Sequence, residues 1–283
     1  MVETLKKLHS SLDPIYGRSE TDAIIRIIFH HLKNWSLTDM LIHRQDELSP
    51  FIKSQIDEIL NRLLNYEPIQ YITGEARFHG MEMNVKPGVL IPRPETDELT
   101  DIIIKENDGK EDLRVLDIAT GSGCIAVALS KGIARASVTA VDISEKALAC
   151  AERNAAKNGA DVRFVRCDIL DDSARDAIGG SGFDIIVSNP PYIPLGDKAS
   201  MHANVTMHEP HEALFVPDAD PLLFYVRIAR LGRELLRDGG SLCFEIYERC
   251  SERVAEMLAS ESYTEIVLMN DANLKPRMIC CRK

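Results

Sequence analysis

Short apolar runs alternate with longer segments of helical periodicity from about residue 111 to the end of the chain. Apolar runs that are bounded by turn residues and separated by helices are typical of strands in a parallel sheet. The predicted strands lie at residues 113–118, 138–142, 161–165, 183–187 and 241–246. The final apolar runs, 263–269 and 277–281, predict a closing antiparallel pair. We therefore expect an α/β fold with a Rossmann-like, doubly wound sheet, an antiparallel last strand and helices on both faces.

The first 74 residues are predicted to be helical throughout. Ser49-Pro50 is a helix start, because it combines an N-cap residue with a proline at the first helical position. Apolar residues then recur at three- and four-residue steps, at Phe51, Ile52, Ile56, Ile59, Leu60, Leu63 and Leu64. We expect this stripe to form the core of a small all-helical N-terminal domain over residues 1–74.

Glycine and proline residues interrupt the chain between these two patterns. The apolar positions Phe78, Met81, Met83 and Val85 predict a short β-hairpin there. Thr96 is followed by two acidic residues and predicts the N-cap of a helix. We therefore expect three parts: a helical domain at 1–74, a β-hairpin linker at 75–94 and a larger α/β domain at 95–283.

Composition narrows the classes of protein. A net charge of -11 without clustered Lys and Arg argues against a nucleic-acid substrate, because binding to phosphate backbones depends on such clusters. The seven cysteines contain no Cys-x-x-Cys pair and lie mostly in apolar segments, so we expect reduced, buried thiols and no metal site. No apolar stretch approaches the roughly 18 residues of a membrane span, and Met1 to His9 do not resemble a signal peptide. We expect a monomeric, cytoplasmic protein without a membrane attachment.

Candidate binding residues stand where the predicted strands end. The glycine turn, which consists of the small residues Ala119, Thr120, Gly121, Ser122 and Gly123, follows the first strand. Asp142 ends the second strand. Asp168 and Ile169 follow the third strand. In parallel α/β sheets ligands bind outside the carboxyl ends of the strands, so these segments are expected to meet at one site.

The glycine turn and Asp142 together suit a cofactor that contains adenosine. A glycine turn lets a ligand approach the backbone, and an acidic residue ending the next strand accepts hydrogen bonds from ribose hydroxyls. The run GSGCIA at 121–126 also satisfies a dinucleotide-binding pattern, but no hydride-transfer apparatus follows it. Asp117, just before the turn, is placed to reach the amino group of an amino-acid moiety. This combination favours S-adenosylmethionine, with Asp168 and Ile169 flanking the adenine ring.

The stretch Asn189, Pro190, Pro191, Tyr192 ends the fourth predicted strand. Each proline fixes φ and lacks an N–H, so the strand ends here in a rigid, non-helical corner. A stiff corner with exposed carbonyl groups suits a planar amide or an amino-bearing base. The side-chain oxygen of Asn189 and the backbone carbonyl of Pro190 can each accept one N–H of such a group, and Tyr192 can stack on its flat face.

Six stretches carry a resemblance to a known family: PIQYITG at 68–74, LIPRPET at 90–96, DIATGSG at 117–123, Val141-Asp142, SNPPYI at 188–193, and Glu209-Pro210 with Ala213-Leu214. They cover nearly the whole chain. With them the sequence resembles the release factor glutamine methyltransferases, which are class I S-adenosylmethionine-dependent methyltransferases. The resemblance implies a helical N-terminal substrate-recognition domain at 1–74, a hairpin linker at 75–94 and a doubly wound catalytic domain at 95–283. It also implies methylation of the side-chain amide of the Gln in the Gly-Gly-Gln motif of class I peptide chain release factors.

The same resemblance implies roles for individual residues. Residues 119–123 would hold the methionine part of the cofactor, Asp142 its ribose, and Asp168 with Ile169 its adenine, whereas residues 189–192 would bind the glutamine. Ala119 stands where the family usually has a glycine, so we expect a backbone without a positive φ there. The family's usual Arg before Glu-Pro is not found around residues 205–208, and residues 270–274 lack its usual Gly.

Three other functions fit parts of these observations. A glutamine methyltransferase of a large-subunit ribosomal protein would share the site chemistry. An amino-methyltransferase acting on nucleic-acid bases would use the same corner on an exocyclic amine, and the acidic composition disfavours it. A cofactor-binding scaffold without activity would retain the glycine turn, and the intact Asn-Pro-Pro-Tyr stretch disfavours that alternative.

Overall fold

The computed structural model describes residues 1–283, which form two units. The first unit comprises residues 1–74 together with residues 202–208. The second comprises residues 75–201 and 209–283. The short segment 202–208 therefore leaves the second unit and returns to it, a connection that no feature of the sequence indicates.

The first unit is built from helices. They are α1 (Val2–Tyr16), α2 (Arg18–Lys33), α3 (Leu37–Ile42), α4 (Pro50–Leu64), α5 (Ile69–Thr73) and α10 (Ala203–His208). Its core contains fully buried residues from α1, α2 and α4, among them Leu8, Phe29 and Leu63. Each such side chain contributes about 1.5–3 kcal/mol by its removal from water. The segment with α10 joins this unit through His202, whose ring lies 5.7 Å from that of Tyr16.

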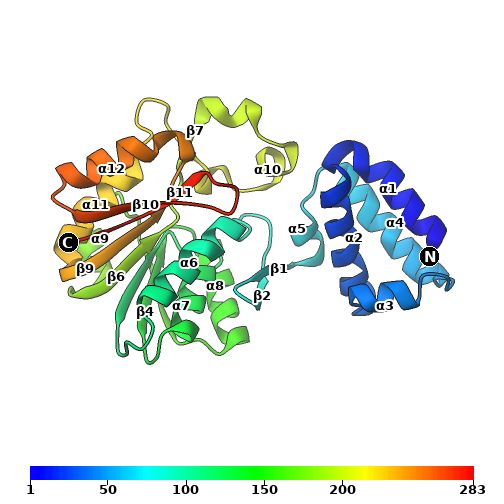
Figure 1. The fold of residues 1–283 in the computed structure, drawn as a ribbon, viewed down its shortest axis with the longest axis horizontal. Coiled ribbons are helices and arrows are strands. Elements are labelled where there is room, and N and C mark those ends of the chain that lie inside the picture. The colour runs from blue at the N-terminus through cyan, green and yellow to red at the C-terminus, as the bar shows by residue number, and fades with distance from the viewer. The chain divides into compact units, whose positions relative to one another are not determined.

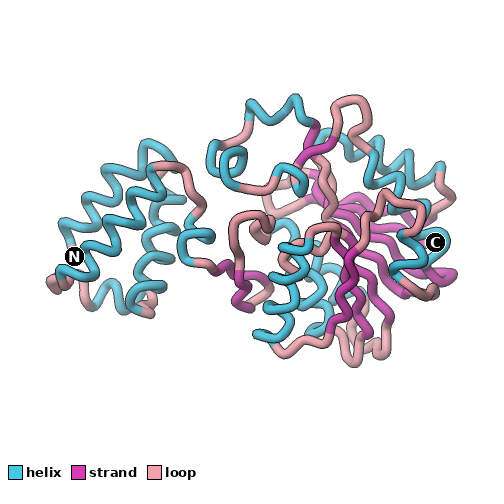
Figure 2. The backbone as a smooth tube through the Cα atoms, turned by 180° about the vertical axis from the view of Figure 1, so that it is seen from behind, coloured by secondary structure: helices cyan, strands magenta, loops and turns pink.

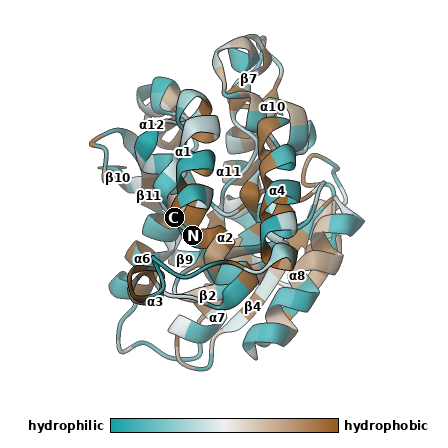
Figure 3. Cartoon of the chain, turned by 90° about the vertical axis from the view of Figure 1, so that its right-hand side faces the viewer, coloured by the Kyte–Doolittle hydropathy of each residue, from teal (hydrophilic) through white to brown (hydrophobic).

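Helix α4 confirms the predicted start and most of the predicted stripe. The Ser49 hydroxyl accepts a hydrogen bond from the Ile52 N–H at 3.3 Å, and Pro50 is the first helical residue. Phe51 and Leu64 were expected in the core but are 69% and 39% exposed. With 3.6 residues per turn, Phe51 lies roughly 120° around the helix from the centre of the buried stripe. Figure 3 shows hydrophobic and hydrophilic residues side by side around this helix.

The second unit contains a seven-stranded sheet in the order β10-β11-β9-β6-β3-β4-β5. The strands are β3 (Arg114–Ile118), β4 (Ser137–Asp142), β5 (Val162–Arg166), β6 (Phe183–Ser188), β9 (Leu236–Glu245), β10 (Thr264–Asn270) and β11 (Pro276–Arg282). The first five are parallel, and β11 is antiparallel to both of its neighbours. This arrangement confirms the predicted sheet, including its antiparallel closing pair (Figures 1 and 2).

Helices cover both faces of this sheet. One face carries α6 (Pro94–Glu106), α7 (Cys124–Gly132) and α8 (Glu145–Asn158), and the other carries α9 (Ala174–Ile178), α11 (Leu223–Leu235) and α12 (Ser251–Ser260) (Figure 1). Alternate residues of a strand enter opposite cores: Val187 packs beneath the first group, whereas Ile186 packs beneath the second. This alternation explains why the strands read as continuous apolar runs.

Shorter elements complete the second unit. They are the parallel pair β7 (Ile193–Pro194) and β8 (Phe215–Val216), and 3₁₀ turns at Leu195–Ser200, His211–Ala213 and Glu248–Cys250. Across the whole chain, no helix combines the length and the apolar character that crossing a membrane requires.

Two local expectations were wrong. Thr96 does not cap α6, because the helix already begins at Pro94, where a proline needs no N–H partner. Cys243 and Cys280 were expected as separate reduced thiols, but they face each other on β9 and β11 and form a disulfide, with their Cα atoms 4.2 Å apart. The register that brings the two cysteines together comes from the pairing of strands distant in sequence.

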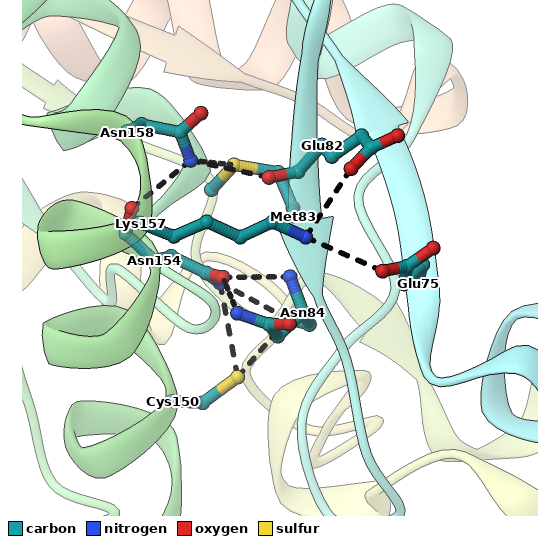
Figure 4. A network of polar contacts seen from close by, with 8 residues as sticks. All are labelled: Glu75, Glu82, Met83, Asn84, Cys150, Asn154, Lys157 and Asn158. Carbon is teal, nitrogen blue, oxygen red and sulfur yellow. Dashed lines mark hydrogen bonds and ion pairs between the residues drawn. The ribbon is translucent and has the colours of Figure 1, made fainter.

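The hairpin of β1 (Glu75–Phe78) and β2 (Met81–Asn84) is fastened to α8 by polar contacts (Figure 4). The buried Asn154 amide oxygen accepts from the Asn84 N–H at 2.6 Å, and its NH₂ group donates to the Asn84 carbonyl at 3.0 Å. The same NH₂ group donates to the Ser122 carbonyl at 2.8 Å. Asn154 therefore connects the hairpin to the glycine turn.

An ion pair between a partly exposed arginine and a buried carboxylate joins two of the stretches that carry the family resemblance. The Arg93 guanidinium donates to Glu209 Oε1 at 2.5 Å, and the Ile91 N–H donates to Oε2 of the same carboxylate at 3.2 Å. The Glu209 side chain is only 1% exposed. Residues 90–96 are thereby held against the start of the segment that follows residue 208.

Removing Arg93 should destabilise the second unit, because the buried Glu209 carboxylate would lose its countercharge. We expect Arg93→Ala to lower the free energy of unfolding by about 3–5 kcal/mol, measured by urea denaturation. A second variant that combines Arg93→Ala with Glu209→Gln serves as the control and should regain part of the loss. Equal denaturation midpoints for wild type and Arg93→Ala would show that this pair does not hold the segment.

Candidate active site at the carboxyl edge of the sheet

A cavity of about 250 Å³ opens at the carboxyl ends of β3, β4, β5 and β6. Seven of the predicted site residues line it: Ala119, Gly121, Asp142, Asp168, Ile169, Asn189 and Pro191. The other six, Asp117, Thr120, Ser122, Gly123, Pro190 and Tyr192, lie outside its lining. Residues that sequence reasoning did not propose as site residues also line it, among them Val89, Glu212 and Phe224.

The glycine turn is shaped by close packing against α8. Gly123 is the N-cap of α7 and has a φ of +79°, and a Cβ atom there would lie 2.8 Å from the Ala151 Cβ. Only glycine permits both the backbone conformation and this approach. The Thr120 N–H donates to the Val141 carbonyl at 3.0 Å, which ties the turn to the next strand.

Ala119 occupies a left-handed conformation with a φ of +60°. This corrects the expectation that its backbone would avoid a positive φ. This conformation costs a residue with a Cβ about 1–2 kcal/mol. Ala119 also lines the cavity. The fold thus holds this residue in a strained conformation at the site.

The Asp142 carboxylate connects the glycine turn to the start of α8. Its Oδ2 accepts from the Gly121 N–H at 2.8 Å, and its Oδ1 accepts from the Ser144 N–H at 2.9 Å. Burial raises the pKa of Asp142, and the carboxylate of Glu212 adds to that rise. Each oxygen retains acceptor capacity, so the group can accept hydrogen bonds from two adjacent hydroxyls of a ligand.

Asp117 is fully buried beside the turn. Its Oδ2 accepts from the Thr120 hydroxyl at 2.6 Å and from the Ala126 N–H at 3.2 Å, whereas its Oδ1 has no hydrogen-bond partner. Burial raises the pKa of Asp117 to about 7. An unsatisfied buried acceptor carries a free-energy cost of about 1–3 kcal/mol, which a ligand with a donor group would remove.

Asp168 and Ile169 follow the end of β5 and line the cavity there. Asp168 is exposed and its Oδ1 accepts from the Leu170 N–H at 2.9 Å, whereas Ile169 is buried. The Arg227 guanidinium donates to the Ile169 carbonyl at 2.8 Å and fixes this backbone. Together with Phe224, which also lines the cavity, Ile169 offers apolar surface suited to a flat ring.

The Asn-Pro-Pro-Tyr corner follows β6, and hydrogen bonds to buried side chains hold it in place. The Asn189 NH₂ group donates to Thr96 Oγ1 at 3.1 Å, and the Tyr192 hydroxyl donates to Glu245 Oε1 at 3.0 Å. The Tyr192 ring stacks on that of Tyr247, with centroids 6.1 Å apart. Burial, with the nearby Glu245 carboxylate, raises the pKa of Tyr192 well above its ordinary value.

Sequence reasoning missed Glu245, which is fully buried at the end of β9. Its Oε2 accepts from the Thr96 hydroxyl at 2.5 Å. Burial raises the pKa of Glu245, although its two hydroxyl donors oppose that rise. A carboxylate at the carboxyl end of an apolar run was the available signal, as it was for Asp117 and Asp142.

Asp117 should make the stability of the chain fall as pH rises. The unfolded state loses this proton near pH 4, whereas the folded state retains it to about pH 7. The stabilisation from the bound proton is thus present below pH 4 and lost as pH rises through 7, by at most about 4 kcal/mol. Urea denaturation of wild type and Asp117→Asn between pH 4.5 and 8 should show a steeper decline for wild type. Parallel curves would contradict the prediction.

Ala119→Gly should leave the chain at least as stable as wild type. Glycine removes the strain of the positive φ, which offsets the larger entropy it loses on folding, about 0.5–1 kcal/mol. Ala128→Gly in α7 is the matched control and should destabilise by about 1 kcal/mol or more, because Ala128 is helical and buried. Thermal denaturation measures both variants. A loss of stability in Ala119→Gly equal to that of the control would contradict the strained conformation.

Comparison with known proteins relates this geometry to a family. Residues 3–74 match the family described as PrmC N-terminal domain, and residues 80–214 match the Methyltransferase small domain. The chain is 44% identical to the release factor glutamine methyltransferase of Bacteroides thetaiotaomicron, over 98% of both chains. It is 40% identical to the enzyme of that name from Flavobacterium psychrophilum, over 95% of this chain and 94% of that one.

A solved structure shares the fold at low identity. It is a 16S rRNA methyltransferase of T. thermophilus in complex with AdoMet and guanosine, with a TM-score of 0.52 and 18% identity over 74% of this chain and 49% of that one. The relatives in sequence, which match the chain almost from end to end, settle its membership. The chain belongs to the release factor glutamine methyltransferase family.

Proposed function

We propose that this protein transfers a methyl group from S-adenosylmethionine to the side-chain amide nitrogen of the Gln in the Gly-Gly-Gln motif of class I peptide chain release factors, acting in the cytoplasm as a monomer. The observation that carries the proposal is the 44% identity to a release factor glutamine methyltransferase over 98% of both chains. The cavity at the carboxyl edge, lined in part by Asn189, supports it with a site of suitable chemistry.

The residues around the glycine turn fit the proposed cofactor. The free Oδ1 of Asp117 suits the ammonium group of a methionine moiety beside residues 119–123. Asp142 would accept from the ribose hydroxyls, and Asp168 with Ile169 would bound the adenine. When bound, S-adenosylmethionine supplies a methyl group on a positively charged sulfur, which is the electrophile of the reaction.

The proposed catalytic residues act on the glutamine amide. Its nitrogen is a weak nucleophile because the lone pair is delocalised into the carbonyl. The Asn189 side-chain oxygen and the Pro190 carbonyl would each accept one N–H, which orients the nitrogen and stabilises the positive charge that develops on it. Such positioning can lower the activation free energy by about 7–11 kcal/mol. Pro191 would keep the corner rigid and Tyr192 would wall the flat amide.

The helical unit is the proposed recognition domain for the release factor. Its surface carries large apolar side chains that are exposed: Leu37, Leu41 and Ile42 in α3, and Phe51 in α4. Leu37 and Leu41 stand one helical turn apart and therefore share a face. Exposed apolar side chains that gather on one element are typical of surfaces that contact another protein.

Asn189→Ala should lower kcat by about 10²-fold or more, because the substrate amide loses a preorganised acceptor. Cofactor affinity, measured by calorimetry, should stay close to that of wild type. Asn273→Ala, at an exposed position, is the control and should keep full activity. Near-normal turnover in Asn189→Ala would refute the assignment of Asn189.

Methyl transfer from labelled S-adenosylmethionine tests the substrate directly. The acceptors are a class I release factor, the same factor with the Gly-Gly-Gln glutamine replaced, large-subunit ribosomal proteins and ribosomal RNA. We expect label on the intact release factor alone. Label on a ribosomal protein or on RNA would replace the proposed substrate, and no label on any acceptor would indicate a scaffold without activity.

A further inference from the structure

A line of hydrogen bonds leads from a buried carboxylate to the amide of Asn189. Glu245 accepts from the Thr96 hydroxyl at 2.5 Å, and Thr96 Oγ1 accepts from the Asn189 NH₂ group at 3.1 Å. The other carboxylate oxygen accepts from the Tyr192 hydroxyl at 3.0 Å. Thr96 and Glu245 are both almost fully buried, so no water competes for these groups. Three segments distant in sequence meet here: α6, the corner after β6, and the end of β9.

The direction of each hydrogen bond follows from the chemistry of the carboxylate. Both oxygens of Glu245 accept from hydroxyl groups, those of Thr96 and Tyr192, and each hydroxyl has a single proton to donate. The proton of Thr96 is directed at Glu245, so Thr96 presents only lone pairs to Asn189. Asn189 must therefore turn its NH₂ group toward Thr96, because its oxygen would face another acceptor with no proton between them.

This orientation determines what Asn189 presents to the cavity. Asn189 lines the cavity, and its side-chain oxygen accepts no hydrogen bond within the protein. In the proposed reaction the substrate contributes N–H donors, so an acceptor is required opposite them. The reversed amide would place NH₂ against NH₂ and would abolish the hydrogen bond to the substrate.

We propose that Glu245, acting through Thr96, is a positioning residue that holds the Asn189 amide with its oxygen toward the substrate. The proposal rests on the proposed function, because it assigns Asn189 the role of acceptor. Neither Glu245 nor Thr96 touches the substrate amide, since the carboxylate oxygens are directed at Thr96 and Tyr192 and the Thr96 hydroxyl is directed at Glu245 and Asn189. Glu245 and Thr96 act by selecting one of the two orientations of the Asn189 side-chain amide.

Glu245→Gln reverses the chain of donors with almost no change in shape. The buried Tyr192 hydroxyl needs an acceptor, so the new carbonyl oxygen faces it and the new NH₂ group faces Thr96. Thr96 then accepts from the Gln side chain and directs its own proton at Asn189. The Asn189 oxygen therefore turns toward Thr96, and its NH₂ group turns toward the cavity. We expect kcat to fall at least 50-fold, with the affinity for S-adenosylmethionine within twofold of wild type.

Two further variants separate positioning from a general loss of structure. Thr96→Ser keeps the hydroxyl and should keep kcat within about fivefold of wild type, whereas Thr96→Val should resemble Glu245→Gln. Adding Asn189→Asp to Glu245→Gln restores an acceptor that has no wrong orientation, since one Asp oxygen accepts from Thr96 and the other faces the cavity. The kcat of this double variant should be at least tenfold higher than that of Glu245→Gln alone.

A measurement on the side chain itself keeps the inference separable from the proposed substrate. In nuclear magnetic resonance spectra of ¹⁵N-labelled protein, the Asn189 side-chain NH₂ signal is identified by its loss in Asn189→Asp. Its exchange with solvent should be slow in wild type and in Thr96→Ser, and at least tenfold faster in Glu245→Gln.

The outcomes distinguish the two proposals. Unchanged exchange of the Asn189 amide in Glu245→Gln, or unchanged kcat, would overturn the positioning role. The expected exchange pattern in a wild-type protein that leaves release factors unlabelled would support the orientation of Asn189 and refute the proposed substrate. Equal losses in Thr96→Ser and Thr96→Val, without rescue by the double variant, would show that Glu245 serves stability alone.

Discussion

The cost of burying carboxylates governs how the site is assembled. A buried carboxylate needs donors, and in this chain those donors come from segments far away in sequence. Glu245 binds the hydroxyls of Thr96 and Tyr192, and Glu209 binds Arg93. Satisfying these groups brings α6, the corner after β6 and the segment after residue 208 together. The same contacts that satisfy the charges therefore place the Asn-Pro-Pro-Tyr corner at the cavity.

The glycine turn shows a second constraint, which is backbone strain. Gly123 is required by its left-handed φ and by the approach of Ala151. Ala119 adopts a left-handed φ as well, although it carries a methyl group. The surrounding fold holds Ala119 in this conformation because the turn is tied to β4 through Thr120 and Gly121. Strain of this kind concentrates where a backbone has to meet a ligand.

Local pattern predicted the architecture well, for reasons that can be named. Strands buried on both faces read as apolar runs, so the order of strands and helices followed from the sequence, as did the antiparallel closing pair. The start of α4 followed from Ser49 and Pro50. The predictions were wrong where the outcome depended on a residue's position around a helix or on which residue begins a helix. Phe51 lies off the buried stripe, and Pro94 begins α6 before Thr96.

The kinds of group at the site, and the strand end at which each one stands, can be read from the order of residues along the chain. Periodicity and turn chemistry act over a few residues, and that range suffices to place Asp117, Asp142 and Asn189 at the carboxyl edge. The partners of these groups became visible in the folded chain: Thr96 faces Glu245, Arg93 faces Glu209, and Asn154 contacts the glycine turn. These pairs depend on packing across the sheet and on the desolvation of charge, which no local pattern encodes.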